Sequence, residues 1–128
     1  MKIEHVAYIV KDPPAVAAWY VKHLGWTIKR GEDTRPFTHF IADSTGQVMV
    51  ELYNNPDATV PEYASMHPLV LHLALTSEAI DDDRDRLLAA GCTDLGGIML
   101  NPAGDRLAMM RDPWGMALQL CQRRVPMT

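Results

Sequence analysis

The chain contains the same order of structural elements twice, and this repeat constrains its fold more than any other feature. Each half has the pattern of a strand, a helix and three further strands. The separations agree as well: His5 lies 46 residues before Glu51, and His72 lies 47 residues before Gln119. Because identity between the halves is low, the shared order and separations are the evidence for a duplication. The sequence therefore predicts two βαβββ modules.

Capping residues and prolines predict where the helices begin and end. Asp12 and the two prolines after it are expected to begin the first helix, which ends at Gly25. Ser77 and Gly91 are expected to bound the second helix in the same way. The expected helices cover residues 12–25 and 77–91. The expected strands cover residues 3–10, 26–31, 37–42, 47–53, 69–76, 94–100, 106–110 and 116–122.

The fold class that follows is α+β, with two βαβββ modules that form a curved, mixed β-sheet cleft flanked by helices. Module one is expected to cover about residues 1–56 and module two about residues 69–124, in a single domain of residues 1–128. At 128 residues, the chain is large enough to bury a core without disulfides or structural metals.

Composition argues against two classes of partner. The formal net charge is −4 and no basic stripe is available for phosphates, so no nucleic-acid partner is expected. No apolar run approaches the ~18 residues of a membrane helix. The N-terminal stretch MKIEHVAYIV has the pattern of a strand from its start and contains Glu4 and His5, so it is not expected to be a signal peptide. We therefore expect a cytoplasmic protein in which Cys92 and Cys121 are free thiols.

Four of the expected strands contain one strongly polar side chain at matching positions of the repeat. These residues are His5, Glu51, His72 and Gln119. Side chains alternate across a strand, so the neighbours of each residue point to the opposite face. Those neighbours are aliphatic in three of the four strands and can pack under a helix. Glu4, beside His5, is the exception.

If the four polar faces line one concave surface, two imidazoles, one carboxylate and one amide oxygen converge there. This donor set suits a borderline divalent ion such as zinc, nickel, iron(II), manganese or cobalt. With one carboxylate, the site has a net charge of about +1, which suits a Lewis acid that receives an anionic substrate oxygen. A single strand histidine is more often a core residue bonded within the protein, so the metal hypothesis depends on all four residues together.

The order of the motifs resembles the vicinal oxygen chelate superfamily. That superfamily includes glyoxalase I, methylmalonyl-CoA epimerase, fosfomycin-resistance thiol transferases, extradiol dioxygenases and bleomycin-binding proteins. The stretches that show the resemblance span essentially the whole chain: IEHVAYIVKD, WYVKHLGW, VMVELYN, LVLHLALT, LLAAGC and RDPWGMALQL. The resemblance implies a fold of two βαβββ modules and pairing of chains into a homodimer.

The resemblance also implies which residues bind the metal. The ligands of the superfamily lie on the first and fourth strand of each module, at positions that correspond to His5, Glu51, His72 and Gln119. In the glyoxalase I-like arrangement, the first two would come from one chain and the last two from its partner. Glyoxalase I-like enzymes usually have glutamate where this chain has Gln119. An amide oxygen can bind a metal but cannot take a proton at neutral pH, so Glu51 is the candidate catalytic base.

Two functional hypotheses from different classes follow. The first is a metal-dependent glyoxalase I-like lyase or isomerase that chelates vicinal oxygens of a small substrate and stabilises an enediolate. The second is a non-catalytic module that binds a small molecule, as the bleomycin-binding proteins do, and Gln119 is its main support. A thiol transferase also stays open, whereas Gln119 weakens a dioxygenase hypothesis, because the facial triad of those enzymes needs a carboxylate.

Several other charged and aromatic residues are candidates for functional or structural roles. The DDDRD run at residues 81–85 is expected to be a solvated helix start, since acidic residues are favoured near a helix N-terminus. Arg35 and Arg106 are candidates to meet an anionic substrate. Trp114 is a candidate for the rim of a pocket. His23 is expected at the C-terminal end of the first helix, and His39 and His67 have no assigned role.

Overall fold

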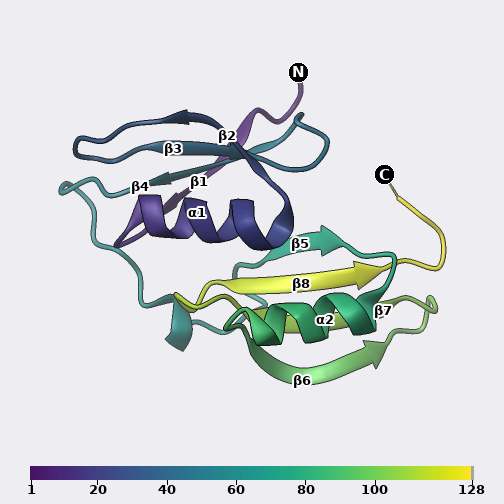
Figure 1. The fold of residues 1–128 in the computed structure, drawn as a ribbon. Coiled ribbons are helices and arrows are strands. Elements are labelled where there is room, and N and C mark those ends of the chain that lie inside the picture. Colours follow the sequence, from purple (N-terminus) through teal and green to yellow (C-terminus); the bar gives the residue numbers. More distant parts are fainter. Residues whose placement is uncertain (128) are drawn as a thin grey trace. The chain divides into compact units, whose positions relative to one another are not determined.

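The computed structural model describes residues 1–127, which divide into two compact units at residue 61 (Figure 1). Each unit contains a strand, a helix and three further strands, which confirms the α+β class with two βαβββ modules. The first unit contains β1 (His5–Ile9), α1 (Pro13–Leu24), β2 (Thr27–Gly31), β3 (His39–Ala42) and β4 (Met49–Tyr53). The second contains a 3₁₀ turn η1 (Tyr63–Ser65), β5 (Leu73–Thr76), α2 (Ile80–Ala89), β6 (Thr93–Leu100), β7 (Arg106–Arg111) and β8 (Ala117–Gln122).

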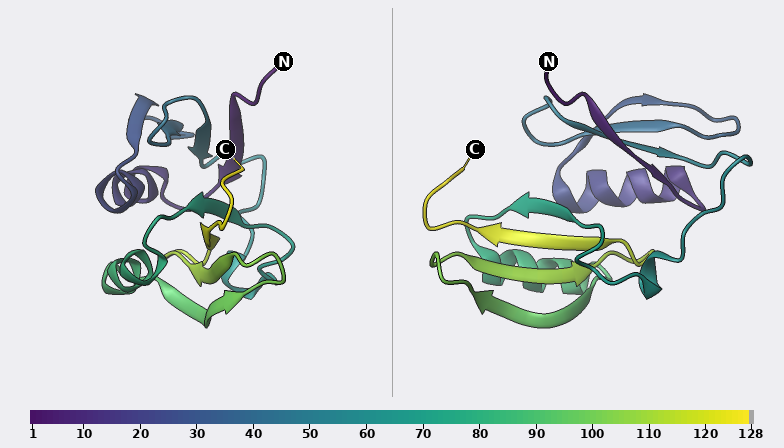
Figure 2. Two further views of the ribbon diagram at one scale, coloured as in Figure 1. Left: turned by 90° about the vertical axis from the view of Figure 1, so that its right-hand side faces the viewer. Right: turned by 180° about the vertical axis from the view of Figure 1, so that it is seen from behind.

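The first sheet has the strand order β1-β4-β3-β2, in which β1 is parallel to β4 and the other neighbours are antiparallel. Helix α1 lies against one face of this sheet (Figure 2). Val16 and Tyr20 of α1 are buried there, as are Val50 and Leu52 of β4. Because side chains alternate along a strand, Glu51 points to the opposite face.

The second sheet repeats this plan with the order β5-β8-β7-β6, in which β5 is parallel to β8. Helix α2 lies against one face of it (Figure 2). Ile80 and Leu87 of α2 are buried, as are Leu118 and Leu120 of β8. Gln119, between those two leucines, therefore points to the face that α2 does not cover.

The boundaries of α1 are those that the sequence predicts. The side chain of Asp12 accepts a hydrogen bond from the backbone N–H of Ala15 at 3.1 Å, and prolines occupy the first turn. Gly25 ends the helix in the left-handed conformation, at φ 69°. This glycine is suited to the position because it lacks the Cβ that disfavours a positive φ.

The expected start of the second helix at Ser77 is wrong. Helix α2 begins at Ile80, with Ala79 at the N-cap position. The hydroxyl of Ser77 donates instead to the carboxylate of Asp83 at 2.6 Å, so it does not cap backbone N–H groups. The carboxylate of Asp83, in the acidic first turn of α2, binds the Ser77 hydroxyl that was expected to cap the helix.

The strand expected at residues 69–76 is also shorter than predicted. Residues 68–70 form a turn in which the Val70 N–H donates to the His67 carbonyl at 2.9 Å, and β5 begins only at Leu73. Leu69 and Val70 are each 71% exposed. The apolar run suggested a buried strand, but the local hydrogen bonds of the turn prevail. His72 therefore immediately precedes the strand. The other seven strands agree with their expected ends to within two residues.

The two modules pair their parallel strands in the same register. Ala7 lies opposite Glu51 in the first sheet, and Ala74 lies opposite Gln119 in the second. Each alanine follows a histidine, His5 or His72, by two residues. The repeat found in the sequence is therefore also a repeat of strand register.

Two further findings bear on the composition. No helix within residues 1–127 is long and apolar enough to cross a membrane. Cys92 and Cys121 are both buried and free of disulfide bonds, as expected. Burial raises the pKa of the Cys92 thiol to about 12.

Replacing Gly115 with alanine is expected to destabilise the protein more than replacing Gly97 with alanine. Both glycines have a positive φ, 89° and 78°, so each variant incurs the cost of about 1–2 kcal/mol of a left-handed alanine. Only at Gly115 would the new Cβ meet a neighbour, the backbone nitrogen of Ala64 at 2.7 Å. This overlap adds about 1–3 kcal/mol. Urea denaturation measures both free energies of unfolding, and equal losses would contradict the close packing of η1 on this turn.

Candidate functional site

In the first module, the structure brings His5 and Glu51 together. Nε2 of His5 lies 3.3 Å from Oε2 of Glu51, and the two side chains are 34% and 22% exposed. The contact follows from the strand register, because Glu51 lies opposite Ala7, two residues beyond His5 on the parallel strand. A ligand in solution can therefore reach both groups.

The other ring nitrogen of His5 contacts the carboxylate of Glu4. A carboxylate only accepts, so the Nδ1 of His5 carries a proton. Metal-bound histidines typically donate their second ring nitrogen to a carboxylate or a carbonyl in this way, which fixes the ring and its tautomer. Glu4, the residue that did not fit the expected apolar face, is therefore the hydrogen-bond partner that orients His5.

The separation of 3.3 Å suits a shared metal ion. Two ligands bound to one tetrahedral ion, with bonds of about 2.0–2.2 Å, lie about 3.4 Å apart. The Nε2 of His5 and the Oε2 of Glu51 already have this spacing. A neutral imidazole and a carboxylate are also ligands that zinc, iron(II) and nickel accept. The pair therefore fits two of the positions around such an ion.

In the second module, the partner of His72 is a backbone carbonyl. Its Nδ1 lies 3.0 Å from the carbonyl oxygen of Pro68. Because a carbonyl oxygen only accepts, Nδ1 is protonated, and in the neutral ring the lone pair is then on Nε2. His72 is thus oriented through Nδ1 in the same sense as His5, with a carbonyl in place of a carboxylate.

Gln119 occupies the position in β8 that corresponds to Glu51 in β4. Its Oε1 accepts a hydrogen bond from the thiol of Cys121, with 3.4 Å between sulfur and oxygen. Burial raises the pKa of Cys121, so the thiol keeps its proton at neutral pH and can donate. An amide oxygen has two lone pairs, and this bond leaves one of them for another partner.

Arg111 was missed by the sequence reasoning, and it holds the segment that orients His72. Its guanidinium donates to three carbonyl oxygens: Tyr63 at 2.9 Å, Met66 at 2.6 Å and Gly115 at 2.8 Å. Two of these carbonyls lie within five residues of Pro68, whose carbonyl accepts from His72. A cation directly before the DPWG turn was the only available signal in the sequence.

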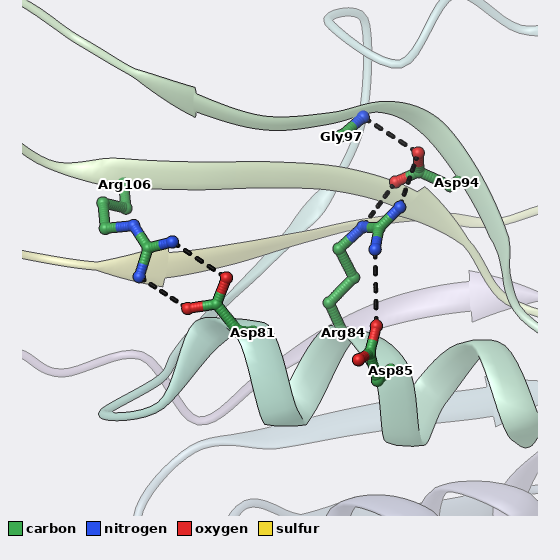
Figure 3. A network of polar contacts seen from close by, with 6 residues as sticks. All are labelled: Asp81, Arg84, Asp85, Asp94, Gly97 and Arg106. Carbon is green, nitrogen blue, oxygen red and sulfur yellow. Dashed lines mark hydrogen bonds and ion pairs between the residues drawn. The ribbon is translucent and has the colours of Figure 1, made fainter.

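Arg106 has surroundings different from those expected. Arg106 makes two bonds to Asp81, at 2.7 and 2.9 Å, and this pairing lowers the pKa of that carboxylate (Figure 3). Arg84 pairs with Asp94 and Asp85 in the same way (Figure 3). The acidic run of α2 is thus a set of ion pairs at the helix surface. Arg106, a candidate to meet an anionic substrate, is thus paired with Asp81.

The remaining candidates have local partners or stand at the surface. His39 is buried, with Nδ1 2.8 Å from the Phe37 carbonyl, and His23 packs on Trp19 near the end of α1. His67 accepts from the N–H of Leu69. Arg35 is exposed in the loop before β3, and Trp114 is half-buried in the turn before β8.

Within residues 1–127, no group of three or more His, Cys, Asp or Glu side chains is close enough to hold a metal ion. The closest arrangement of predicted ligands is the His5–Glu51 pair. Each module thus contributes one imidazole and one oxygen donor at equivalent positions, and these are donor types that a divalent ion accepts.

Comparison with known families decides where this chain belongs. The family described as the Glyoxalase/Bleomycin resistance protein/Dioxygenase superfamily matches residues 2–120. The chain belongs to this superfamily. The resemblance of the motifs is thereby confirmed, and so is the βαβββ architecture that it implied. The superfamily includes both enzymes and non-catalytic binding proteins, so membership alone does not assign an activity.

Solved structures show the same fold at low identity. The chain is similar to the antibiotic binding protein TnmS3 from Streptomyces sp. CB03234, at 21% identity and a TM-score of 0.74 over 96% of each chain. It is also similar to a superfamily member from Sphaerobacter thermophilus, at 20% identity and a TM-score of 0.77 over 96% of this chain and 98% of that one. A glyoxalase family protein from Bacillus cereus matches at 15% identity and a TM-score of 0.79, over 95% and 93% of the two chains. No curated protein sequence matches the chain.

Replacing Arg111 with glutamine is expected to loosen the segment that leads to His72. Each charge-assisted bond to a carbonyl contributes about 1.5–3 kcal/mol, and a glutamine cannot reach three carbonyls at once. Hydrogen exchange is expected to speed up at residues 63–72. Arg106→Gln is the matched control, since it removes the same charge from a surface ion pair. Equal exchange of this segment in the two variants would show that Arg111 does not hold it.

Proposed function

We propose that the protein is a metal-dependent, glyoxalase I-like lyase or isomerase that acts on a small molecule with two neighbouring oxygens. The observation that supports this most is the His5–Glu51 pair, whose 3.3 Å spacing suits two ligands of one ion. The equivalent register of Gln119 and the orientation of His72 by Pro68 support a second pair of ligands.

The proposed metal site consists of His5, Glu51, His72 and Gln119, and it binds one divalent ion: zinc, nickel, iron, manganese or cobalt. The two histidines contribute Nε2, because their Nδ1 atoms donate to Glu4 and Pro68. When bound, the ion supplies Lewis acidity that stabilises negative charge on neighbouring substrate oxygens.

Glu51 is the proposed base for proton transfer. It is the only carboxylate among the four proposed ligands, and its partial exposure lets a substrate approach. Gln119 cannot take a proton at neutral pH. The thiol of Cys121 keeps its own proton, since burial raises its pKa. The acid–base step of such an enzyme therefore depends on a single group.

We further propose that the protein is a homodimer with a shared site, as in the glyoxalase I-like arrangement. In that assembly His5 and Glu51 of one chain and His72 and Gln119 of its partner bind the same ion. The finding that each module has only one imidazole and one oxygen donor in the proposed set supports a site that needs two modules.

A non-catalytic module that binds a small molecule is the second candidate. Gln119 favours it, because the site then lacks a second ionisable oxygen ligand. TnmS3, an antibiotic binding protein, has a similar fold, so this fold also serves binding. A thiol transferase is compatible with the same residues, because it uses the metal chiefly as an electrophile.

Metal binding is expected to require all four proposed ligands. Protein purified without chelator should contain one divalent ion per His5–Glu51 pair, measured by elemental analysis. Replacing either histidine with alanine should lower metal affinity at least tenfold and abolish the rise in melting temperature on adding metal. His23→Ala is the control, since His23 lies on α1 beside Trp19.

Mixed dimers test whether the site is shared. Homodimers of the His5→Ala chain and of the His72→Ala chain should each fail to bind metal. A mixed dimer that contains one chain of each kind should regain one intact site and about half the metal.

Thermal stability separates the two candidate functions. A small molecule that stabilises the protein, with no effect of added metal, would support the non-catalytic candidate.

Replacing Glu51 with glutamine is expected to separate proton transfer from metal binding. The amide oxygen can still coordinate the ion but cannot accept a proton, so turnover should fall about 10²–10⁴-fold. Elemental analysis should still find metal in the Glu51→Gln variant. The separate variant Gln119→Glu should stay active, because it keeps Glu51 and adds a second carboxylate. Unchanged turnover in Glu51→Gln would exclude Glu51 as the base.

A further inference from the structure

A row of side chains crosses the first sheet from its edge to the proposed metal ligands. Arg30 of β2 lies opposite Phe40 of β3, and Phe40 lies opposite Glu51 of β4. Glu51 in turn lies opposite Ala7 of β1. Directly opposed residues project from the same face of a sheet, so Arg30, Phe40 and Glu51 share the face that α1 does not cover.

Phe40 separates the guanidinium from the carboxylate. The Cζ atom of Arg30 lies 4.6 Å from the centre of the Phe40 ring, and the ring of His5 meets the same phenyl ring edge-on at 5.4 Å and 81°. Phe40 is only 9% exposed. The arginine is thus held beside the His5–Glu51 pair, yet it does not neutralise Glu51.

Arg30 has no carboxylate partner within residues 1–127, in contrast to four other arginines. Those that form ion pairs are Arg84, Arg86, Arg106 and Arg123. A guanidinium that stacks on a ring uses its flat face and keeps its in-plane N–H donors. These donors match the two oxygens of a carboxylate. Arg30 is exposed, so a ligand can reach it.

We propose that Arg30 binds a carboxylate of the ligand, so that the ligand is an organic anion that carries this carboxylate a few carbons away from the two neighbouring oxygens that bind the metal. Neighbouring strands lie about 4.8 Å apart, so the backbones at Arg30 and Glu51 are about 10 Å apart across two strands. A ligand of five or six carbons can span the distance that remains between the two side chains. This inference names the ligand class for the site proposed above and rests on that site.

Two matched probes test this inference: 2-oxoglutarate, which has neighbouring oxygens and a distal carboxylate, and 2-oxopentanoate, which has the same chain length without that carboxylate. Calorimetric titration of the full-length protein, with and without zinc, should show that 2-oxoglutarate binds about tenfold tighter or more. Arg30→Gln should remove this preference and leave metal affinity unchanged.

Lys29→Gln is the matched control, because it removes the same charge from the neighbouring residue, whose Nζ lies near the turn at Gly46. It should keep the preference for 2-oxoglutarate. The role of Arg30 would be overturned if the Arg30→Gln variant still preferred 2-oxoglutarate over 2-oxopentanoate. It would also be overturned if the unmodified protein showed no such preference. Failure of the proposed metal site has a different signature: zinc would then not change the binding of either probe, whatever the effect of Arg30.

Discussion

The parallel pairing of the first and fourth strands within each module is the constraint on which the candidate site depends. Parallel neighbours cannot be joined by a tight turn, so the chain must pass through a helix and two further strands before it returns. The return brings Glu51 beside Ala7 and Gln119 beside Ala74. A shift of the fourth strand by one residue would turn each polar side chain toward the helix. Burial of the aliphatic neighbours under α1 and α2 opposes such a shift.

The two modules keep this geometry but have diverged in charge. In the first, the imidazole of His5 lies between the carboxylates of Glu4 and Glu51. In the second, His72 donates to a backbone carbonyl, and Gln119 is neutral. The negative charge of the proposed site is therefore confined to one module. The other module supplies neutral donors, and their orientation depends on the backbone between η1 and β5.

This difference makes the second half of the site more dependent on distant contacts. Glu4 is adjacent to His5 in the chain and needs no other residue to reach it. The Pro68 carbonyl, in contrast, lies in an irregular segment that is tied to β7 through Arg111. A cation with three carbonyl acceptors resists movement, because any displacement breaks several charge-assisted bonds. The orientation of His72 thus depends on contacts outside the proposed site.

The sequence by itself determined the two βαβββ modules and the ends of α1. It also determined that His5 and Glu51 lie on the first and fourth strands of the first module. Strand alternation and helix capping are local properties that a single sequence expresses. Tertiary structure decided that Arg106 pairs with Asp81. It also decided that Arg111 anchors the segment before His72. These depend on partners 25 to 48 residues away, such as Asp81 for Arg106 and Tyr63 for Arg111, and no local pattern encodes which distant group a charged side chain meets.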